Sequence, residues 1–533
     1  METQKRIDPE DYRILPGTSE KELIRLLRDP LVRICNLYWI KNADGVEIKF
    51  TPNWAQCVVL HKIYVDGCNR LLIPKARQIG FTTLFAIICL DETHFSTGKQ
   101  ASIVDKTQDD AGEKLDKVRF AWERLPPSIK AEAITNNGRE LEFLNGSRVV
   151  GGKRARGGTN QVLHISEWGP IAFDDPERSK EILTGAIPSV SGTNGKIFAE
   201  STHKGGKGGD WYDQIKNALE KRKEYRTARD FEVIFFPWYL EPRYKLEGDA
   251  RQITPDVHKY FDELEPVLGV QFTTSQRLFY QVEFDRLGTS IYAEYPTTLE
   301  ETWKAPIAGA IYGAEVDKAR IAGRLSDNVL HYPNFPVYTA FDLGAPLNTK
   351  CWIFQAIGDK INMLEALSGD EDCATPAAWV KRLKEKSAYS YGGHFIPHDG
   401  ETLWKRAMQE AELTGVVVLD KPIWEWDNIN DAVAAFARCY FNLKNCQSGI
   451  DALEAYRCKA EADGNIVRNV PVHDWASHFS TAFGYVHQAI RSGKLVDRSA
   501  MPKRPISPNE RSVLRGPRSD SYSFTKRERG ILR

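Results

Sequence analysis

The segment KARQIGFTT (75–83) has the residue types of a loop that holds phosphate groups. It lies between the apolar runs LLIP (71–74) and LFAIICL (84–90), which predict a buried strand followed by a helix. Backbone N–H groups at the start of a helix, together with one cation, can bind a phosphate. Compared with the pattern G-x-x-x-x-G-K-[ST], Lys75 replaces the first glycine and Phe81 replaces the lysine. The segment therefore indicates either a nucleotide site with a displaced lysine or an ordinary strand–helix turn.

In the nucleotide interpretation, four side chains of this segment have distinct roles. Gly80 permits the turn, and Thr82 stands where a hydroxyl would coordinate Mg²⁺. Lys75 supplies the missing positive charge if its long side chain folds back over the loop, and Arg77 could assist it. In the simpler interpretation, the same lysine and arginine are only solvated surface charges.

A second apolar run, VLHISEWG (162–169), ends in an acidic residue. ATPases place a water-activating carboxylate at the end of such a strand, and Glu167 fits that role. Ser166 occupies the position usually held by a metal-binding Asp, so any metal contact there would run through its hydroxyl or a water. The alternative is a strand that ends in a solvent-facing glutamate.

Two further segments are consistent with a nucleotide site. In FTPNWAQ (50–56), the amide of Gln56 can donate and accept, which is what reading an adenine edge requires. In AESTHKGGKGGDWYD (199–213), Ser201 and Thr202 end a strand before a glycine-rich turn and could sense the γ-phosphate. A surface glutamine and a flexible surface loop are the alternative interpretations.

The segment GGKRARGGTN (151–160) places arginines on a glycine-rich loop. Such an arginine can stabilise phosphoryl-transfer charge in the site of a neighbouring subunit, and Arg156 is the first candidate and Arg154 the second. A loop that contacts DNA phosphates is an equally good interpretation.

Three carboxylates in the second half of the chain could hold metal ions. Asp342 follows the strand-like run PVYTAF, Asp399 follows GGHFIP, and Asp474 begins a helix. Two divalent cations bound by such oxygen ligands can clamp the attacking and leaving oxygens of a phosphodiester. Taken singly, each aspartate could be a turn residue or a helix N-cap.

The elements that position these residues divide the chain into two α/β parts. Strand-like runs alternate with helical patterns up to about residue 225, which predicts a mainly parallel sheet covered by helices. From residue 336, two strands joined at Gly358-Asp359 predict an antiparallel hairpin, and a helix is predicted over 431–441 and another over 475–490. The expected divisions are 1–30 (lead-in), 31–225 (first domain), 226–330 (its end and a connection), 331–490 (second domain) and 491–533 (flexible basic tail).

Composition limits the classes of function. The chain has 533 residues, and Lys+Arg equals Asp+Glu at 72 each, so any nucleic-acid contact must come from local basic surfaces. The nine cysteines form no CxxC pair, which argues against a zinc site or a disulfide framework. No apolar run approaches the roughly 18 residues that cross a bilayer. We therefore expect a soluble, intracellular protein without a membrane partner.

The ordered set of motifs resembles the large terminase subunit, the DNA-packaging motor of tailed bacteriophages. The resemblance spans roughly residues 30–490 and rests on the stretches NLYWIKNADGVEIKFTPNWAQ, KARQIGFTT, RARGGTNQVLHISEWG, AESTHKGG, YTAFDLG, PHDG, CQSGIDALEAYR and HDWASHFSTAFGY. It implies an N-terminal P-loop ATPase domain and a C-terminal ribonuclease-H-like nuclease domain, and it favours the displaced lysine. Many relatives have an Asp where this chain has Thr481, so Asp474 is the best remaining third metal ligand.

The resemblance also implies substrates, cofactors and partners. ATP would bind through Gln56, Lys75, Gly80, Thr82 and Thr83, with Mg²⁺ (or Mn²⁺) at Thr82 and two such ions at the three aspartates. The partners would be double-stranded DNA, the small terminase subunit and the portal protein of the procapsid. The chain would form a homo-oligomeric ring on the portal, could be monomeric alone, and would act in the host cytoplasm, outside the mature virion.

Two rival hypotheses remain open. In the first, the chain is a DNA translocase or helicase-like ATPase whose nuclease-like domain only binds DNA. In the second, it is an adaptor with an inactive nucleotide loop, which Phe81 in place of the usual lysine would favour.

Overall fold

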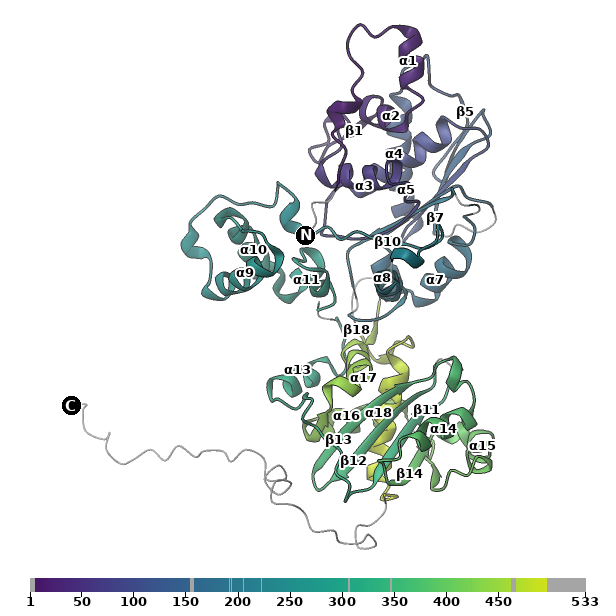
Figure 1. The fold of residues 1–533 in the computed structure, drawn as a ribbon, viewed down its shortest axis with the longest axis vertical. Helices are drawn as coiled ribbons and strands as arrows, with labels where there is room; N and C mark the ends of the chain where they lie inside the picture. The colour runs from purple at the N-terminus through teal and green to yellow at the C-terminus, as the bar shows by residue number, and fades with distance from the viewer. Residues whose placement is uncertain are drawn as a thin grey trace, which may run out of the picture. The chain divides into compact units, whose positions relative to one another are not determined.

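The chain forms two compact units in the computed structural model (Figure 1). The first comprises residues 1–318 and 448–480, the second residues 319–447 and 481–533, and the domain divisions expected from the sequence stay predictions. The structure describes residues 5–153, 158–190, 192, 194–204, 206–221, 223–304, 307–345, 348–422, 424–461 and 466–495.

Among its described residues, the first unit contains an eight-stranded sheet. The strand order is β10 (Glu232–Val233), β3 (Arg70–Pro74), β9 (Lys196–Ser201), β8 (Val162–Ser166), β4 (Gln100–Val104), β7 (Arg148–Gly152), β6 (Glu140–Phe143) and β5 (Ala133–Asn136). Neighbours from β10 to β7 are parallel, and β6 and β5 extend the sheet in antiparallel fashion. The prediction of a mainly parallel sheet is confirmed.

Helices cover both faces of this sheet because its central strands are apolar on both sides. Leu71 and Ile73 of β3 belong to the core of one face, whereas Leu72 belongs to the core of the other. The helices of the first face include α3 (Trp54–Tyr64), α4 (Phe81–His94) and α5 (Gln108–Glu123). Those of the second face include α6 (Trp168–Asp174) and α8 (Asp210–Glu220), and α7 (Pro176–Glu181) leads into Ile182 of the same core.

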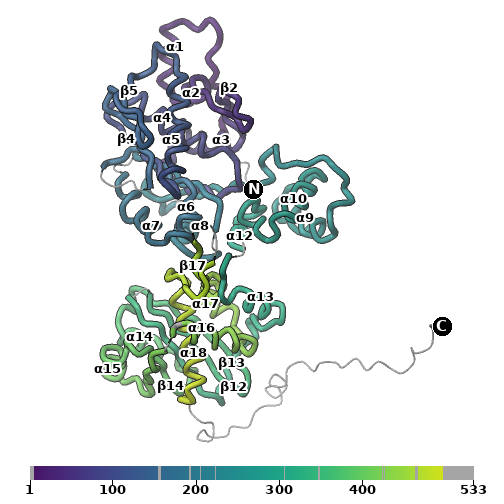
Figure 2. Tube along the Cα trace, turned by 180° about the vertical axis from the view of Figure 1, so that it is seen from behind, coloured from purple at the N-terminus to yellow at the C-terminus, as the bar shows by residue number. Residues whose placement is uncertain are grey.

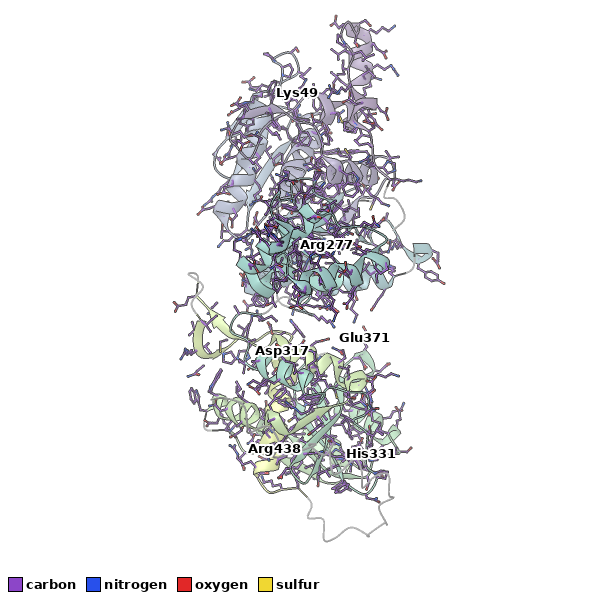
Figure 3. The ribbon with its side chains drawn as sticks, turned by 90° about the vertical axis from the view of Figure 1, so that its left-hand side faces the viewer. Lys49, Arg277, Asp317, His331, Glu371 and Arg438 are labelled. Carbon is purple, nitrogen blue, oxygen red and sulfur yellow. The ribbon has the colours of Figure 1, made fainter. Side chains whose placement is uncertain are left out.

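Residues 237–295 form an aromatic lobe beside the sheet. Its helices α9 (Pro255–Leu268) and α10 (Thr274–Leu287) lie side by side (Figure 2), and α11 (Ile291–Glu294) follows them. Trp238 stacks on Phe272 and Phe279, with ring centroids 6.1 and 5.5 Å apart. Arg277 Nη2, in α10, lies 2.8 Å from Glu265 of α9 and ties the two helices together (Figure 3).

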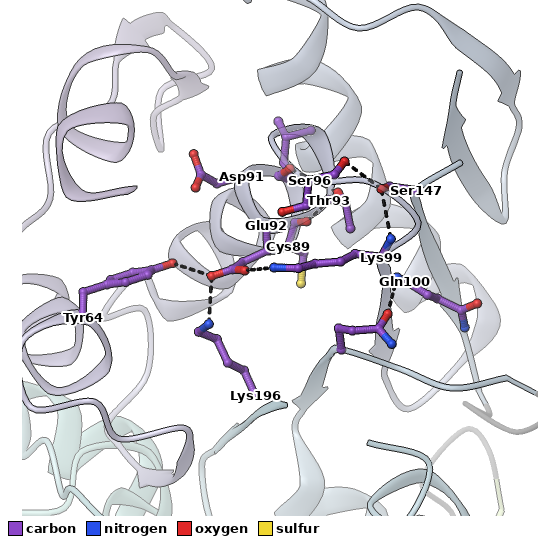
Figure 4. Close-up of polar contacts among 12 residues, drawn as sticks. Tyr64, Cys89, Asp91, Glu92, Thr93, Ser96, Lys99, Gln100, Ser147 and Lys196 are labelled. Carbon is purple, nitrogen blue, oxygen red and sulfur yellow. Dashed lines mark hydrogen bonds and ion pairs between the residues drawn. The ribbon is translucent and has the colours of Figure 1, made fainter. Parts of the chain in front are cut away.

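A charged cluster fixes the end of α4 that lies away from the predicted phosphate loop (Figure 4). Glu92 lies 2.9 Å from both Lys99 Nζ and Lys196 Nζ, and it accepts a hydrogen bond from the Tyr64 hydroxyl. Burial acts to raise the pKa of Glu92, but the two lysines outweigh burial and hold the pKa below its ordinary value. The carboxylate therefore stays charged and joins α4 to the starts of β4 and β9.

Among its described residues, the second unit contains a six-stranded sheet. The order is β15 (Val416–Val418), β14 (Tyr391–Ile396), β11 (Val337–Asp342), β12 (Lys350–Ile357), β13 (Lys360–Ser368) and β16 (Cys439–Phe441). The strands β11, β12 and β13 form an antiparallel meander, and β14 and β15 run parallel to β11. This arrangement is ribonuclease-H-like, as the sequence predicted.

The helix predicted over 431–441 ends early, and this part of the prediction was wrong. The helix α16 (Glu425–Ala435) is followed by a short turn and then by β16, which pairs with Ile361–Met363 of β13. Arg324 donates hydrogen bonds to the carbonyl oxygens of Phe436 and Cys439, at 2.7 and 3.0 Å. A place in the sheet and these two contacts outweigh the helical pattern of the preceding residues.

Helices also cover the second sheet. Trp379 of α14 (Pro376–Glu385) packs against Phe341 on one face, and Phe483 of α18 (Ser477–Arg491) packs against Trp352 on the other. Within the described residues, no helix combines the length and apolar character needed to cross a bilayer. The remaining elements are α1 (Glu20–Leu26), α2 (Pro30–Asn36), β1 (Trp39–Lys41), β2 (Glu47–Lys49), α12 (Leu299–Thr302), α13 (Gly313–Ile321), α15 (Trp404–Glu410), α17 (Leu443–Ala455), β17 (Cys458–Ala460) and β18 (Ile466–Pro471).

Candidate active site

The loop between β3 and α4 is held by backbone hydrogen bonds to the end of β9 and to Phe236, which follows β10. Lys75 N donates to Ser201 O at 3.1 Å, and Ala76 N donates to Phe236 O at 3.0 Å. Gly80 precedes α4 with a φ of 91°, and a Cβ at this position would lie 3.0 Å from Gln56 Nε2. Glycine therefore suits position 80 both in conformation and in space. The loop presents the N-terminus of a 14-residue helix, as a phosphate site requires.

The side chain of Lys75 is buried between two carboxylates. Its Nζ lies 3.2 Å from Glu200 Oε2 and 3.6 Å from Glu167 Oε1. Burial acts to lower the pKa of Lys75, but the two glutamates outweigh burial and raise the pKa above its ordinary value. The displaced lysine is thus charged and lies at the ends of β8 and β9.

Glu200 is at the centre of this site, and the sequence analysis did not single it out. Its side chain is 0% exposed, and burial acts to raise its pKa, but the charge of Lys75 and the imidazole of His164 hold the pKa below its ordinary value. Thr82 Oγ1 and Ser166 Oγ both donate to Glu200 Oε1, at 3.3 and 3.1 Å. A signal was present, because a glutamate that follows the apolar residues IFA in the strand-like run KIFAES must find partners when the strand is buried.

Glu167 directly follows β8 in a left-handed conformation, with φ 55° and ψ 45°. Such a conformation is uncommon for a residue other than glycine and is often found at functional sites. Glu167 N donates to Glu200 O at 2.9 Å, and the carboxylate Oε2 accepts from Thr202 Oγ1 at 3.3 Å and from Ser201 Oγ at 3.5 Å. The structure thus brings Glu167, Ser201 and Thr202 together at one edge of the sheet.

Two adjoining cavities face the loop. The first, about 490 Å³, is lined by Gln56, Gly80 and Thr83, and the second, about 990 Å³, adds Lys75 and Thr82. The other cationic residues that line the second cavity are Lys41, Arg77, Lys106, Lys114, Lys117, Lys204 and Arg243. Its acidic lining residues are Glu113, Glu167, Asp174 and Glu294. Positive side chains outnumber negative ones, which suits a polyanionic ligand.

Gln56 lines the first cavity, and the nitrogen and the oxygen of its side-chain amide each make one hydrogen bond. Its Nε2 donates to Gly80 O at 2.7 Å, and its Oε1 accepts from Asn53 N at 2.8 Å. An amide oxygen can accept a second hydrogen bond and an NH₂ group can donate a second one. The amide therefore retains the capacity to read an adenine edge.

The aromatic lobe supports the phosphate loop from one side. Arg77 Nε lies 2.7 Å from Glu294 Oε2, and Tyr244 donates its hydroxyl to the carbonyl oxygen of Arg77. Arg243 Nη2 donates to Gln78 O at 2.7 Å. Arg77, predicted to contact phosphate, is thus engaged with Glu294 while its side chain is 56% exposed. The other loop arginines singled out by the sequence, Arg154 and Arg156, lie outside the described residues.

The first two predicted nuclease residues end neighbouring parallel strands. Asp342 is the last residue of β11, and Asp399 lies in the turn that follows β14. Lys350 pairs with Asp342 across β11 and β12, a neighbour that the sequence analysis did not identify. Burial lowers the pKa of Lys350, and the charge of Asp342 offsets only part of that effect. Two carboxylates and a lysine thus belong to the same end of the sheet.

The third predicted metal ligand, Asp474, is engaged in an ion pair. Asp474 Oδ2 lies 2.6 Å from Arg457 Nη1, and each side chain is 5% exposed. Asp474 does not begin the helix, as the sequence had predicted it would, but lies in the turn before α18, where its Oδ1 accepts from Ala476 N at 2.9 Å. No group of three His, Cys, Asp or Glu residues in the described ranges is placed to hold a metal ion. The three-aspartate metal site stays a prediction.

Comparisons with solved structures place large terminases among the proteins that this chain is similar to. The HK97 bacteriophage large terminase is 12% identical, with a TM-score of 0.44, and the match covers 86% of this chain and 99% of that chain. The large terminase of a thermophilic bacteriophage in complex with ADP is 13% identical, with a TM-score of 0.31 and coverage of 82% and 99%. The nuclease domain of the bacteriophage SPP1 large terminase, with bound Mn, is 10% identical, with a TM-score of 0.23 and coverage of 30% and 86%. No protein-family model and no curated protein matched the sequence.

Proposed function

We propose that the chain is a motor subunit that hydrolyses ATP to move double-stranded DNA into a viral procapsid and that cuts the DNA concatemer with a metal-dependent nuclease. The observation that carries the first half is the network of buried Lys75 and Glu200 with the partly exposed Glu167, at a cation-lined cavity. It lies at the carboxyl edge of a parallel sheet, where such folds bind ligands. The second half rests on a ribonuclease-H-like sheet in the same chain, with Asp342 and Asp399 at the ends of neighbouring strands.

In this proposal the ATP site is built from the loop and its neighbours. Gln56 reads the adenine, and Lys75 with the N–H groups at Gly80, Thr82 and Thr83 binds the phosphates. Arg77 adds positive charge to the phosphates once its side chain has left the ion pair with Glu294. The oxygen donors around Thr82 suit a hard cation, and bound Mg²⁺ would neutralise charge on the phosphates.

Hydrolysis requires a positioned water, and Glu167 is the residue we assign to orient it. The carboxylate is held by Thr202 and lies beside Lys75, so a change at the phosphates would reach the end of β9 through these contacts. We assign Ser201 and Thr202 to this coupling. Arg156 of a neighbouring subunit would supply charge in trans, with Arg154 as the second candidate.

For DNA cutting, Asp342, Asp399 and Asp474 would hold two divalent cations, Mg²⁺ or Mn²⁺, which would stabilise both the attacking and the leaving oxygen. Carboxylates at the ends of β11 and β14 fit such ions, and Asp474 would first have to leave Arg457. That ion pair favours a second candidate function, a DNA translocase whose nuclease-like domain only binds DNA.

The expected partners follow from the motor proposal. They are double-stranded DNA, the small terminase subunit and the portal protein, on which the chain would form a homo-oligomeric ring although it could be monomeric alone. The site of action would be the host cytoplasm, with transient attachment to the procapsid and absence from the mature virion.

Plasmid cleavage by the purified chain tests the nuclease half. We expect cutting with Mn²⁺ or Mg²⁺, none with EDTA, and none by Asp342→Ala or Asp399→Ala. Loss in Asp474→Ala as well would assign the third ligand only if that variant keeps the melting temperature of the wild type, because Asp474 also holds the buried pair with Arg457. Cutting retained in Asp474→Ala would mean that Asp474 is only the ion-pair partner of Arg457 and does not hold metal. A wild type that turns over ATP but cuts no DNA with either metal would support the translocase.

A further inference from the structure

We infer that Glu200 takes the place of the carboxylate that is missing at Ser166 and positions Thr82 and Lys75 for a metal-bound nucleotide. The inference rests on the proposed ATPase function. Glu200 is outside the usual motif pattern, because it lies on a different strand from the one that usually carries this acid.

The register of the sheet explains how one strand can substitute for another. Ser166 of β8 and Glu200 of β9 are direct partners in neighbouring parallel strands, so their side chains leave the sheet at the same level. Ser166 Oγ donates to Glu200 Oε1 at 3.1 Å, and the same oxygen accepts from Thr82 Oγ1 at 3.3 Å. The Glu200 carboxylate thus lies between the position of the missing acid and the hydroxyl predicted to hold Mg²⁺.

The second oxygen of Glu200 serves the displaced lysine. Glu200 Oε2 lies 3.2 Å from Lys75 Nζ, so one carboxylate contacts both groups that would handle the phosphates. These contacts link the two departures from the usual motif pattern. The lysine is absent from position 81 and is supplied from position 75, and the acid is absent from position 166 and is supplied from position 200.

The burial of the Glu200 carboxylate limits which groups can surround it. A carboxylate that is 0% exposed is costly unless charge and hydrogen bonds compensate it, and Lys75, Thr82, Ser166 and His164 provide that compensation. Glu167 also lies near Lys75, so the lysine already has one carboxylate partner. If Glu200 served only to neutralise Lys75, its contact with Thr82 would not be needed. Thr82, Ser166 and Glu200 offer only oxygen atoms, which are the donors that Mg²⁺ prefers.

The test is Mg²⁺-dependent binding of a fluorescent ADP analogue to the full chain, measured with Mg²⁺ and with EDTA. For the wild type we expect Mg²⁺ to tighten binding. For Glu200→Gln we expect that enhancement to fall by roughly 10- to 100-fold, the usual effect of removing an outer-shell partner of a metal site. Binding in EDTA should change much less than binding in Mg²⁺. Paramagnetic Mn²⁺ titration with ADP, read by electron paramagnetic resonance, measures the same loss without turnover.

Three further variants separate a positioning role from a structural one. Glu92→Gln removes a comparable glutamate that is paired with two lysines at the other end of the sheet (Figure 4), and it should keep the Mg²⁺ enhancement. Glu200→Asp keeps the charge beside Lys75 but withdraws the oxygens from Thr82, so it should lose most of the enhancement. Ser166→Asp combined with Glu200→Gln should recover it.

Each outcome decides between a positioning role of Glu200, a structural role and the absence of an ATP site. Full Mg²⁺ enhancement in Glu200→Gln, or in Glu200→Asp if the first variant does not fold, overturns the inference and leaves the ATP site standing. The same loss in Glu92→Gln would reduce Glu200 to a structural ion pair. A wild type that binds no nucleotide under either condition would instead refute the proposed ATPase function.

Discussion

Thr202 Oγ1 donates a hydrogen bond to Glu167 Oε2 over 3.3 Å, so the end of β9 is joined to the carboxylate that follows β8. Ser201 completes the link, because its Oγ also accepts from Gly169 N at 2.9 Å, in the first turn of α6. A rearrangement of Glu167 around a phosphate would therefore be transmitted through these hydrogen bonds to α6 and to the residues that follow β9. This contact is the physical basis for assigning Ser201 and Thr202 to coupling.

Removing the Thr202 hydroxyl should uncouple ATP turnover from DNA. In Thr202→Val the side chain keeps its shape, but the Glu167 carboxylate loses one donor. We expect nucleotide affinity to stay within about threefold, while DNA-stimulated ATP turnover falls by about tenfold, as for one hydrogen bond to a charged group. Thr93→Val is the control, since the Thr93 hydroxyl is buried within α4 and donates to Cys89 O. Unchanged DNA stimulation in Thr202→Val would remove this residue from the coupling path.

Lys75→Ala should weaken nucleotide binding by about 10- to 100-fold, the effect of losing a charge-assisted contact of roughly 1.5–3 kcal/mol. Lys204→Ala is the matched control, because Lys204 lines the same cavity but has a side chain that is 47% exposed and paired with Asp174. Equilibrium binding of a fluorescent ATP analogue measures both. Equal affinities in the two variants would mean that position 75 does not supply the missing lysine.

Lys75→Ala should also lower the free energy of unfolding. It leaves Glu200 buried without its cationic partner, and breaking a buried pair typically costs about 3–5 kcal/mol. The melting temperature without nucleotide, compared with that of Lys204→Ala, separates this loss of stability from the loss of binding.

The aromatic lobe should influence the nucleotide site through Tyr244. Its hydroxyl donates to the carbonyl of Arg77, in the phosphate loop. Tyr244→Phe removes about 1 kcal/mol of hydrogen bonding, so we expect nucleotide affinity to fall by about fivefold although Tyr244 is not assigned to bind the ligand. Tyr225→Phe, at a side chain on the surface, should have no effect. If Tyr244→Phe bound nucleotide as tightly as the wild type, the lobe would be irrelevant to loop conformation.

Acid should destabilise the chain because four buried histidines are neutral in the folded state. Burial lowers the pKa of His94, His203 and His394 to about 4 and that of His487 to about 3. In the unfolded chain each would have a pKa of about 6.5. A depressed histidine pKa means that the unfolded state binds more protons, so stability is complete above pH ~6.5 and decreases as the pH falls toward ~4. The slope is at most about 1.4 kcal/mol per pH unit for each histidine.

Denaturant unfolding between pH 7.5 and 4.5 measures this dependence. His487→Leu should reduce the pH slope in that window, because it removes one titrating group from the core. The exposed His473 provides the control substitution, His473→Leu. An identical slope in the wild type and His487→Leu would show that His487 does not titrate between the two states.

The sequence was most informative where one interaction dominates. Continuous apolar runs predicted β3 and β8, and the end of β9, to within a residue or so, because strands buried on both faces contain mostly apolar residues. The positions of Lys75 and Glu167 followed from those strands. The hairpin at Gly358-Asp359 followed from its turn residues and flanking alternation.

What the sequence could not provide depends on partners far away in the chain. Glu200 looks like an ordinary member of a strand until its register places it beside Ser166 and Thr82. Residues 439–441 continue a helical pattern, yet pairing with β13 makes them a strand. The Arg457 partner of Asp474 is likewise a matter of tertiary placement. Local patterns carry none of this information.

The order of strands in the first sheet also has a consequence for synthesis on the ribosome. Lys75 emerges early, whereas its buried partner Glu200 and the Phe236 carbonyl that fixes the loop come much later. At about 5–20 residues per second, the 161 residues from Lys75 to Phe236 (236 minus 75) take on the order of 10–30 s to translate. Until β9 has been made, β3 lacks both of its neighbours in the sheet, and its apolar faces are available to chaperones or to aggregation. Nucleotide therefore cannot assist the folding of the nascent first unit until nearly all of that sheet has been made.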